Sequence, residues 1–395
     1  MNQLVDIVNF NADASCLDSE KWLAILKGGA DSLFCRWLLL YVRYKKRMVL
    51  GMTGATISDL IMHNPEAVKI VRDNPDIFQV IFRPYSHDIS LLRTSYGFCC
   101  NLAAGKAVIQ GTFEHACNYY LPPEFMLMNE QVTILARIGV KGTFINPMRY
   151  VPDLATRIPK YPYLVRGIMG ANLGCIPIDG ELTQLYLDTI QSWNVKEWNE
   201  VIQKKEVSTL RLWRDGESSF LIPNGIEREE FWLTNCTADR VHLDGEDYNT
   251  LIEPSLFHSY PVHAFSPWMK ELRMFGYLGR IQDIERRLPN LPAVVRYFWL
   301  LTINSDILSA VEKRSPLIRL RSLPTSEQTQ EFRILRSERG YEGEEYLALL
   351  DRYILNEKDP PELNDPLAPH LIKAKGRIEH LKRLEPLWND AMGSL

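Results

Sequence analysis

The sequence has little excess charge and no long apolar run. Its 45 Lys and Arg residues nearly balance 49 Asp and Glu residues, which leaves a formal net charge of −4. Proteins that bind nucleic acid or anionic lipid through their overall charge are usually basic. Apolar runs such as residues 37–42 and 298–301 are far too short to span a bilayer. We therefore expect neither nucleic acid as a partner nor a membrane span.

Disulfide, metal and cofactor motifs are also missing. The seven cysteines are an odd number, with no C-x-x-C pair and no recurrent spacing to histidine, so we expect reduced thiols and no structural zinc. There is no Gly-rich phosphate loop, dinucleotide fingerprint or H-E-x-x-H helix. The first residues lack the basic and apolar segments of a secretory signal. These absences predict a cytoplasmic protein with no cofactor and no metal, and nothing in the sequence indicates its oligomeric state.

What is present is an alternation of short apolar runs with longer segments of helical period, from residue 4 to about residue 232. This alternation is typical of strands and helices that follow one another in an α/β fold. We expect helices at residues 19–26 and 129–138. The expected strands are residues 4–10, 48–52, 77–82, 107–113, 142–146, 163–168 and 209–213.

Polar side chains stand just after several of these predicted strands. Side chains at the C-terminal ends of parallel strands converge on one mouth, so this placement fits a barrel-like active site. The residues concerned are Asn11, Asp13, Arg83, His87, Glu114, His115, Asn146 and Asp215.

Beyond about residue 267 the apolar residues recur at intervals of three and four, which predicts helices. The expected helices are residues 268–288, 292–312, 344–356 and 370–388. A proline-rich turn at residues 358–366 precedes the last of them. We accordingly divide the chain into a barrel-like catalytic domain, residues 1–265, and a helical bundle packed on it, residues 266–395.

One candidate catalytic carboxylate is Glu124, which follows Leu121-Pro122-Pro123. The two prolines stiffen the backbone and exclude helix immediately before Glu124, so its carboxylate is held at the end of a strand or the start of a helix. A glycosidase requires such rigid placement. The alternative is that Glu124 only complements the dipole of the helix expected at residues 129–138.

A second carboxylate, Asp215, follows the strand expected at residues 209–213. Gly216 lets the chain turn sharply after it, and Phe220 follows nearby. Asp-Gly-Glu also occurs at residues 179–181 and 244–246, and by itself it usually marks only a turn. Asp215 is preferred because a strand precedes it and an aromatic residue follows it.

These two segments resemble those of glycoside hydrolase family 57, especially its 4-alpha-glucanotransferase and amylase members. Leu121-Pro122-Pro123-Glu124 is similar to the family's nucleophile region. Trp213-Arg214-Asp215-Gly216-Glu217, with Phe220, is similar to its acid/base region. The order and separation of the two segments also match, and the resemblance covers roughly the first 235 residues.

The resemblance implies an α/β fold, an incomplete (β/α)7-type barrel followed by a C-terminal helical bundle. It also implies a retaining mechanism, in which Glu124 attacks the anomeric carbon while Asp215 protonates the leaving oxygen and later activates water or an acceptor hydroxyl. The two carboxyl groups of such a pair lie roughly 5 to 5.5 Å apart. The implied activity is that of a glycosidase or transglycosylase acting on an intracellular oligosaccharide, polysaccharide or glycoconjugate.

The first predicted strand departs from this family, which usually opens with a His-x-His-Gln-Pro type segment. Asn9-Phe10-Asn11-Ala12-Asp13 stands there instead, so the donors to sugar hydroxyls are changed. NodB-type polysaccharide deacetylases place an Asp-Asp pair after the first strand and His-x-x-x-His after a later one. Residues 83–87 resemble the second motif with Arg83 in place of its first histidine. Because arginine cannot donate a lone pair to a metal, Asp13 and His87 would form an incomplete zinc site.

Several other side chains are candidates for contacts to a sugar. Arg83 and His87 could bind an acidic sugar, a phosphate or a carboxylate, or they could be an internal ion pair and a structural histidine. The aromatic candidates could stack on pyranose rings or belong to the core; they are Trp213 and Tyr120 first, then Phe220, Trp232 and Tyr119. The expected substrate-binding set is Asn11, Asp13, Arg83, His87, His115, Tyr120, Trp213 and Phe220.

Three functions therefore stay open from the sequence. The first is the retaining glycoside hydrolase or transglycosylase, with a carbohydrate as its substrate. The second is a NodB-like metal-dependent carbohydrate deacetylase, and the third is a non-catalytic sugar-binding barrel.

Overall fold

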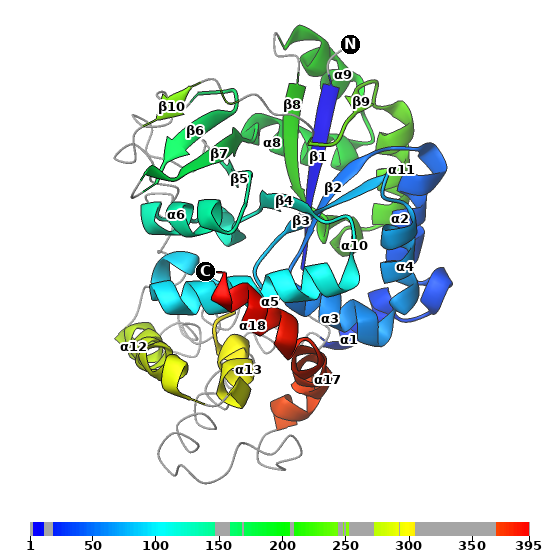
Figure 1. Ribbon diagram of the computed structural model, residues 1–395. Coiled ribbons are helices and arrows are strands. Elements are labelled where there is room, and N and C mark those ends of the chain that lie inside the picture. The colour runs from blue at the N-terminus through cyan, green and yellow to red at the C-terminus, as the bar shows by residue number, and fades with distance from the viewer. Residues whose placement is uncertain are drawn as a thin grey trace.

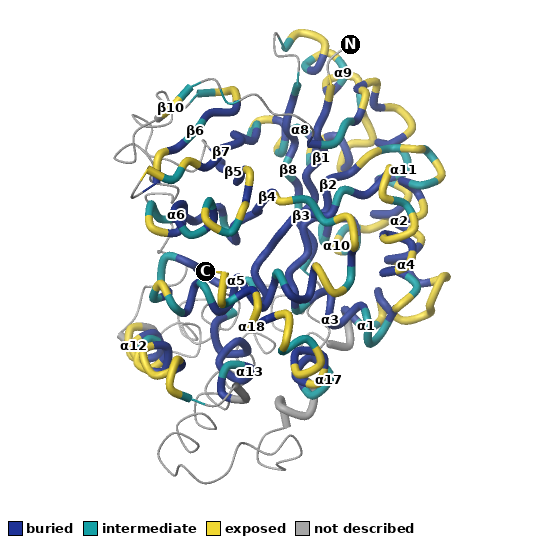
Figure 2. The backbone as a smooth tube through the Cα atoms, in the orientation of Figure 1, coloured by how far each residue is buried: buried dark blue, intermediate teal, exposed yellow. Residues whose placement is uncertain are grey.

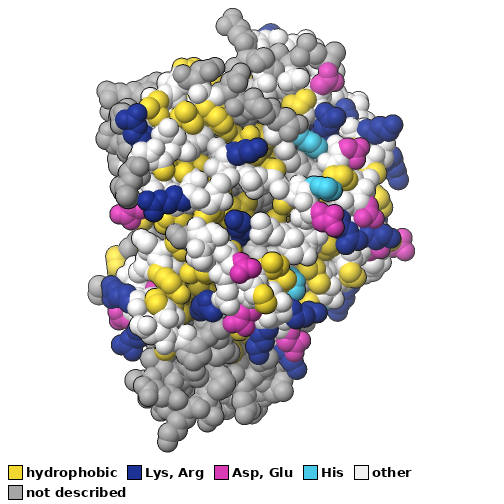
Figure 3. Space-filling view, in the orientation of Figure 1, with side chains coloured by type: hydrophobic (Ala, Val, Ile, Leu, Met, Phe, Trp, Pro, Cys, Tyr) yellow, Lys and Arg dark blue, Asp and Glu magenta, His cyan; other side chains and the backbone are white. Residues whose placement is uncertain are grey.

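The computed structural model describes residues 3–11, 19–146, 159–167, 170–205, 209–243, 248, 250–252, 272–291, 293–304 and 369–394. These residues form a mixed α/β fold around one ten-stranded sheet (Figure 1). None of the helices in the described ranges has both the length and the apolar character needed to cross a membrane. On the face drawn in Figure 3, basic and acidic side chains lie interspersed, in keeping with the small net charge.

Seven strands of the sheet run parallel, in the order β7-β5-β4-β3-β2-β1-β8. Their bounds are β1 Gln3–Phe10, β2 Met48–Met52, β3 Phe78–Phe82, β4 Cys117–Tyr120, β5 Gly142–Ile145, β7 Asn172–Pro177 and β8 Thr209–Asp215. β6 (Tyr163–Arg166) pairs antiparallel with β7, and β10 (Leu251–Ile252) pairs with β6. The short β9 (Asp239–Arg240) pairs with the start of β1.

Helices cover the outer face of this sheet, and their bounds follow the chain. They are α1 Ser19–Leu26, α2 Leu33–Tyr44, α3 Gly54–His63, α4 Pro65–Asp73, α5 Ser95–Thr112, α6 Asn129–Arg137, α8 Gly180–Ser192, α9 Lys196–Lys204, α10 Ser218–Leu221 and α11 Gly225–Asn235. Short 3-10 turns lie at Gly29–Asp31, Ser90–Leu92, Pro123–Phe125 and Leu288–Asn290. Figure 2 shows the strands buried and the exposed residues concentrated on the outer sides of the helices.

Both faces of the parallel strands are buried, which explains their nearly continuous apolar sequences. Along β1, Val5 and Ile7 belong to a cluster inside the curved sheet, whereas Leu4 and Val8 pack in the larger core beneath the helices. The inner cluster is completed by side chains from the facing strands and their ends, namely Val49, Ile81, Tyr119, Leu121, Phe125, Phe144, Ile176, Ile178 and Leu243. The interior of the barrel is therefore a packed core rather than a channel.

The sheet is open between β7 and β8, because the described strands include no ladder between them. The gap is bridged just after β7, where the Asp179 amide donates to the Arg211 carbonyl at 2.8 Å. The hydroxyl of Thr183 in α8 also donates to the Trp213 carbonyl at 2.6 Å. The expectation of an incomplete barrel of seven parallel strands is confirmed.

The strand expected at residues 107–113 is wrong, because these residues are the last part of α5. Ala107, Val108 and Ile109 are buried in a helix that is surrounded by protein along much of its length, so its apolar residues do not reveal the helical period. The fourth parallel strand is β4 instead, a four-residue strand with an exposed polar Asn118. The other predicted strands correspond to observed ones, but β7 was not predicted.

Four helices of the C-terminal part are described: α12 Leu272–Arg287, α13 Ala293–Thr302, α17 Pro369–Arg383 and α18 Glu385–Gly393. Figure 1 shows them gathered beside α5. The single helix expected at residues 370–388 is two helices, since Pro386 begins a new one. The helix expected at 344–356 and the turn at 358–366 lie outside the described residues. So does the domain boundary expected at 265/266, and the division into two domains stays a prediction.

Buried polar contacts attach α17 to α3. The Arg377 guanidinium forms two bonds with Asp59, with Nε–Oδ1 at 2.8 Å and Nη2–Oδ2 at 2.5 Å. His380 Nδ1 lies 2.8 Å from the Ser58 hydroxyl, and burial lowers the pKa of His380 to about 4. The neutral imidazole and the paired arginine allow this polar interface to be buried at acceptable cost.

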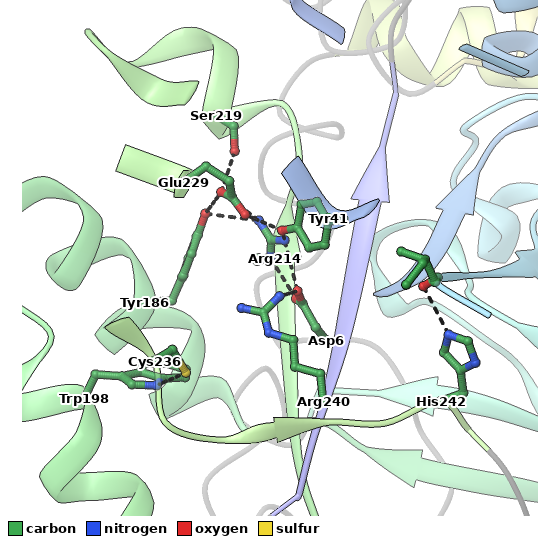
Figure 4. Close-up of polar contacts among 11 residues, drawn as sticks. Asp6, Tyr41, Tyr186, Trp198, Arg214, Ser219, Glu229, Cys236, Arg240 and His242 are labelled. Atoms are coloured by element: carbon green, nitrogen blue, oxygen red, sulfur yellow. Dashed lines mark hydrogen bonds and ion pairs between the residues drawn. The ribbon is translucent and has the colours of Figure 1, made fainter. Parts of the chain in front are cut away.

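A buried network of charged side chains ties the first strand to the last parallel strand (Figure 4). Arg214 of β8 binds Asp6 of β1 through two bonds, with Nε–Oδ1 at 2.7 Å and Nη2–Oδ2 at 3.0 Å. Arg240 of β9 donates to the same carboxylate at 2.7 Å. The Arg214 Nη1 atom lies 3.0 Å from Glu229 of α11. Two guanidinium groups thus neutralise two carboxylates.

Uncharged groups complete the network. Glu229 also accepts hydrogen bonds from Tyr41, from Tyr186 at 2.8 Å and from Ser219 at 3.0 Å. Arg240 lies 4.0 Å from the centre of the Trp232 ring, a cation–π contact. The network therefore joins β1, β8 and β9 to α2, α8, α10 and α11, and each of its charges has a partner of opposite sign.

We predict that Asp6→Asn lowers the free energy of unfolding by about 3 kcal/mol or more, because two buried guanidinium groups lose a shared carboxylate. The matched control is Asp239→Asn, which removes an exposed carboxylate one residue from Arg240 and should leave stability close to that of the wild type. Urea unfolding of both variants tests this. Equal stability of the two variants would contradict the importance assigned to the network.

Candidate functional site

Polar side chains from several strands meet at the C-terminal edge of the sheet. Asn9 on β1 is paired in register with Asp215, the last residue of β8. Arg83 and His87 follow β3, and Glu124 follows β4. Because these strands are parallel, their ends deliver all of these residues to one mouth.

The backbone at Glu124 is strained. Glu124 and Phe125 have φ values of 53° and 57°, in the left-handed region that residues with a Cβ rarely adopt. Pro122 and Pro123 are buried immediately before them. The Phe125 ring is fixed by an edge-to-face contact with Trp213, with ring centroids 5.2 Å apart. Such conformations persist where the surroundings over-determine them, and they cluster at functional sites.

Asp215 is placed by the pairing of β8 with β1. The Gly216 amide donates to the Asn9 carbonyl at 2.7 Å, so the chain turns across the end of β1. A Cβ on Gly216 would lie 2.8 Å from Cγ1 of Val8, which explains the glycine. The Asn9 side-chain amide donates to Asp215 Oδ1 at 2.9 Å. One turn later, Glu217 accepts a 2.6 Å hydrogen bond from the Asn11 amide.

Arg83 lies buried at the floor of this mouth and is 1% exposed. Its Nη1 atom donates to the side-chain oxygen of Asn9 and, at 2.9 Å, to that of Asn11. Burial lowers the pKa of Arg83 to about 10, and the shift is opposed by the acidic groups around it, Tyr120, Asp215, Glu217 and Glu124. Arg83 is therefore still a cation at neutral pH and interacts electrostatically with all three carboxylates.

His87 connects this polar floor to Glu124. Its Nδ1 atom lies 3.3 Å from the Asn11 amide nitrogen, and its Nε2 atom lies 3.7 Å from Glu124 Oε1. The side chains of His87 and Glu124 are 17% and 24% exposed, so both reach the surface of the mouth.

The loop that carries Arg83 and His87 is clamped to α5. The Asn101 side chain accepts from the Ser86 amide at 2.8 Å and donates to the Ser86 carbonyl at 3.2 Å. A Cβ on Gly105 would overlap the Arg83 carbonyl oxygen and lie 2.6 Å from the carbonyl carbon of Pro84. Only glycine lets the helix approach the loop this closely.

The structure brings together Glu124, Asp215, Asn11, Arg83 and His87, with Trp213 supporting the Glu124 loop. Asp13 lies outside the described residues. Sequence reasoning missed Asn9 and Glu217 as members of the site. Asn9 could have been found as the polar inward-facing residue of an apolar strand, two positions before Asn11.

Three residues of the expected substrate-binding set lie elsewhere. His115 is exposed in the turn that precedes β4, at the opposite edge of the sheet from the mouth. Phe220 packs against Phe10, Phe34 and Trp37 in the outer core. Tyr120 is fully buried, so its ring cannot stack on a sugar. The misplaced strand at residues 107–113 caused the error at His115.

The two lower-ranked aromatic candidates are core residues too. Trp232 is fully buried under Arg240, and Tyr119 lies inside the barrel. Within the described ranges, no group of three or more His, Cys, Asp or Glu side chains is arranged to hold a metal ion. Arg83, where the deacetylase motif has its first histidine, donates to two asparagine oxygens.

Comparison with known proteins gives a match in structure alone. No protein-family model matches the sequence, and no curated protein matches it. The structure is similar to a GH57-type branching enzyme from Pyrococcus horikoshii, with a TM-score of 0.64 and 11% identity over 98% of this chain and 96% of that one. It is also similar to a GH57 branching enzyme from Thermococcus kodakaraensis, with a TM-score of 0.63 and 10% identity over 98% and 95% of the chains.

A third similar structure is the 4-alpha-glucanotransferase from Thermococcus litoralis, with a TM-score of 0.63 and 11% identity over 78% of this chain. The match spans only 56% of the glucanotransferase chain. These similarities establish that the chain has the fold of GH57-type enzymes, as the two carboxylate segments had indicated.

We predict that Glu124→Asn is more stable to unfolding than Glu124→Gln by about 0.5–1 kcal/mol. Both variants replace the carboxylate by an amide, but asparagine tolerates the left-handed backbone better than glutamine does. Chemical denaturation of the two variants measures the difference. Equal stabilities would show that the backbone at this position is not strained.

We also predict that Gly105→Ala lowers the free energy of unfolding by about 1–3 kcal/mol, because the added methyl group collides with the backbone at Arg83 and Pro84. Gly111→Ala in the same helix is the control. Its Cβ would meet only the flexible end of Leu384, at 3.0 Å, and alanine favours the helix. A stability loss in Gly111→Ala as large as in Gly105→Ala would argue against the close-approach explanation.

Proposed function

We propose that this chain is a retaining glycoside hydrolase or transglycosylase that acts on an oligosaccharide, a polysaccharide or a glycoconjugate. Glu124 is its nucleophile and Asp215 its general acid/base. The observation that carries the proposal is the electrostatic interaction of one buried cation, Arg83, with both Glu124 and Asp215. Two carboxylates that share a neighbour across the mouth can flank one glycosidic bond.

The backbone supports the role of Glu124. A nucleophile must be held close to the carbon that it attacks, because loose placement costs rate. The left-handed conformations at Glu124 and Phe125, the preceding prolines and the Phe125–Trp213 contact fix the direction of this side chain. The reading of Glu124 as a carboxylate that only complements a helix dipole explains none of these features.

The chemistry then follows in two steps. The Glu124 carboxylate attacks the anomeric carbon while Asp215 gives its proton to the leaving oxygen, so the glycosidic bond breaks and a glycosyl-enzyme ester forms. Asp215, now ionised, takes a proton from water or an acceptor hydroxyl, which attacks the anomeric carbon and releases Glu124. Water gives hydrolysis, and a sugar acceptor gives transfer.

The fold adds support for this class of substrate. The structures with the same fold are a branching enzyme, a second branching enzyme and a 4-alpha-glucanotransferase, so α-glucans are the first substrates to test. The intracellular location of the substrate stays a prediction.

The test compares wild type, Glu124→Gln and Asp215→Asn on α-glucan oligosaccharides and on aryl glycosides with activated leaving groups. We predict that Glu124→Gln abolishes turnover of both substrate classes. Asp215→Asn should lose about 10²–10⁴-fold on oligosaccharides but much less on activated glycosides, because a good leaving group needs no proton. Mass spectrometry should detect a glycosyl adduct on Glu124 in Asp215→Asn.

Two exposed carboxylates serve as controls. Asp188→Asn and Glu130→Gln change residues on the outer sides of α8 and α6 and should keep wild-type rates. Full activity in both Glu124→Gln and Asp215→Asn would overturn the assignment. Release of acetate from N-acetylated sugars, lost on addition of a chelator, would instead favour the deacetylase. Saccharide binding without turnover would favour the non-catalytic barrel.

A further inference from the structure

One buried donor determines how two asparagine side chains are oriented in the mouth. A guanidinium group only donates hydrogen bonds. The atoms of Asn9 and Asn11 that contact Arg83 Nη1 must therefore be their oxygens, as the structure has them. If either amide were reversed, its N–H groups would face an N–H of Arg83 at the floor of the site. The amide nitrogens of both asparagines must consequently point away from Arg83.

The first amide nitrogen ends on the proposed acid/base. Asn9 Nδ2 donates to Asp215 Oδ1 at 2.9 Å, and Asn9 is 6% exposed. Because Oδ1 already accepts this hydrogen bond, the proton of the acid form is favoured on Oδ2. Arg83 thereby acts on the geometry of Asp215 through Asn9.

The second amide nitrogen reaches the proposed nucleophile through His87. Asn11 Nδ2 can only donate, so His87 Nδ1, 3.3 Å away, must accept. In a neutral imidazole whose Nδ1 accepts, the proton is on Nε2. That N–H faces Glu124 Oε1 at 3.7 Å. A proton on Nδ1 would set two donors against each other.

We propose that Arg83, Asn9, Asn11 and His87 form a positioning relay that directs a hydrogen-bond donor toward each of the two carboxylates. His87 is the neutral Nε2–H tautomer, and its N–H dipole stabilises the anionic form of Glu124 that attacks. The 3.7 Å separation is longer than a hydrogen bond, and contacts of this kind commonly tighten when substrate binds. The roles of the two carboxylates rest on the proposed function, but the donor directions do not.

This relay uses residues from the segment in which the chain departs from the family that it resembles. Arg83 is almost completely buried and both of its hydrogen bonds end on protein oxygens. It therefore acts through its neighbours and not by binding an acidic substrate. Asn9 and Asn11 are adjacent inward-facing positions of the same strand end, so one guanidinium can contact both.

The test is the tautomer of His87, measured by long-range ¹H–¹⁵N correlation on the full chain labelled with ¹⁵N-histidine. The His87 signal is assigned by its loss in His87→Gln. We expect Nε2 protonated and Nδ1 unprotonated in the wild type. In Asn11→Asp the group facing Nδ1 can only accept, so we expect Nδ1 to become protonated. Asn74→Asp, whose amide donates to the Ile70 carbonyl at the end of α4, is the matched control and should leave the His87 signal unchanged.

Arg83→Met tests the origin of the relay, since methionine fills the space without directing either amide. We expect a mixture of His87 tautomers in this variant. A wild-type Nδ1–H tautomer, an unchanged tautomer in Asn11→Asp, or a pure Nε2–H tautomer in folded Arg83→Met would each overturn the proposal. If Arg83→Met does not fold, Asn11→Asp decides alone.

This measurement needs no substrate, so it separates the two proposals. A chain with the Nε2–H tautomer but no glycosidase activity would sink the proposed function and keep the relay. An active glycosidase with the Nδ1–H tautomer would do the reverse.

Discussion

The double ion pair between Asp6 and Arg214 is the interaction on which the rest of the arrangement depends. It joins the first strand to the last parallel strand across 208 positions of sequence, in a place where neither charge can be solvated. Because alternate residues of a strand face opposite sides, an Arg214 held against the outer helices forces Asp215 to point inward. Glu229 and Arg240 bring the helices and β9 into the same network, so the direction of one side chain at the mouth is set by packing on the other face of the sheet.

The two faces of the sheet hold charge in different ways. Outside, two guanidinium groups and two carboxylates balance each other, as a structural network requires in a region of low dielectric. Inside, Arg83 interacts with three carboxylates, Glu124, Asp215 and Glu217, so these four groups carry a net negative charge. A site of this sign favours the positive charge that develops on a sugar ring as its glycosidic bond breaks. The same sign would disfavour a phosphate or an acidic sugar.

The parts of the fold that could be predicted are those with a local signal. Strands β1, β2 and β8 are apolar runs that end at polar residues, and Glu124 and Asp215 stand in segments with proline or glycine punctuation. β4 was missed because it is short and because α5, buried along much of its length, resembles a strand at its end. The errors at His115 and Phe220 came from sequence proximity to a motif, which says little about which side of the sheet a residue faces.

The contacts that define the site were not predictable, because they join residues that are far apart in the sequence. Asn9 meets Asp215 and Asn11 meets Glu217 across 206 positions, and no local pattern encodes either pair. The orientation of each asparagine depends on Arg83, which itself looked like a substituted metal ligand. Only the register of β1 against β8 shows that Asn9, and not just Asn11, reaches an acidic side chain.

The contact between Phe125 and Trp213 also imposes an order in time. Glu124 is held in an unfavourable backbone conformation partly by a ring that is synthesised almost ninety residues later. A nascent chain that has not yet completed β8 lacks this constraint, and the residues around Glu124 are then at liberty to relax toward ordinary conformations. The reactive geometry consequently arises only when the barrel closes around its last parallel strand, so truncated or half-folded chains carry the carboxylate without its aim.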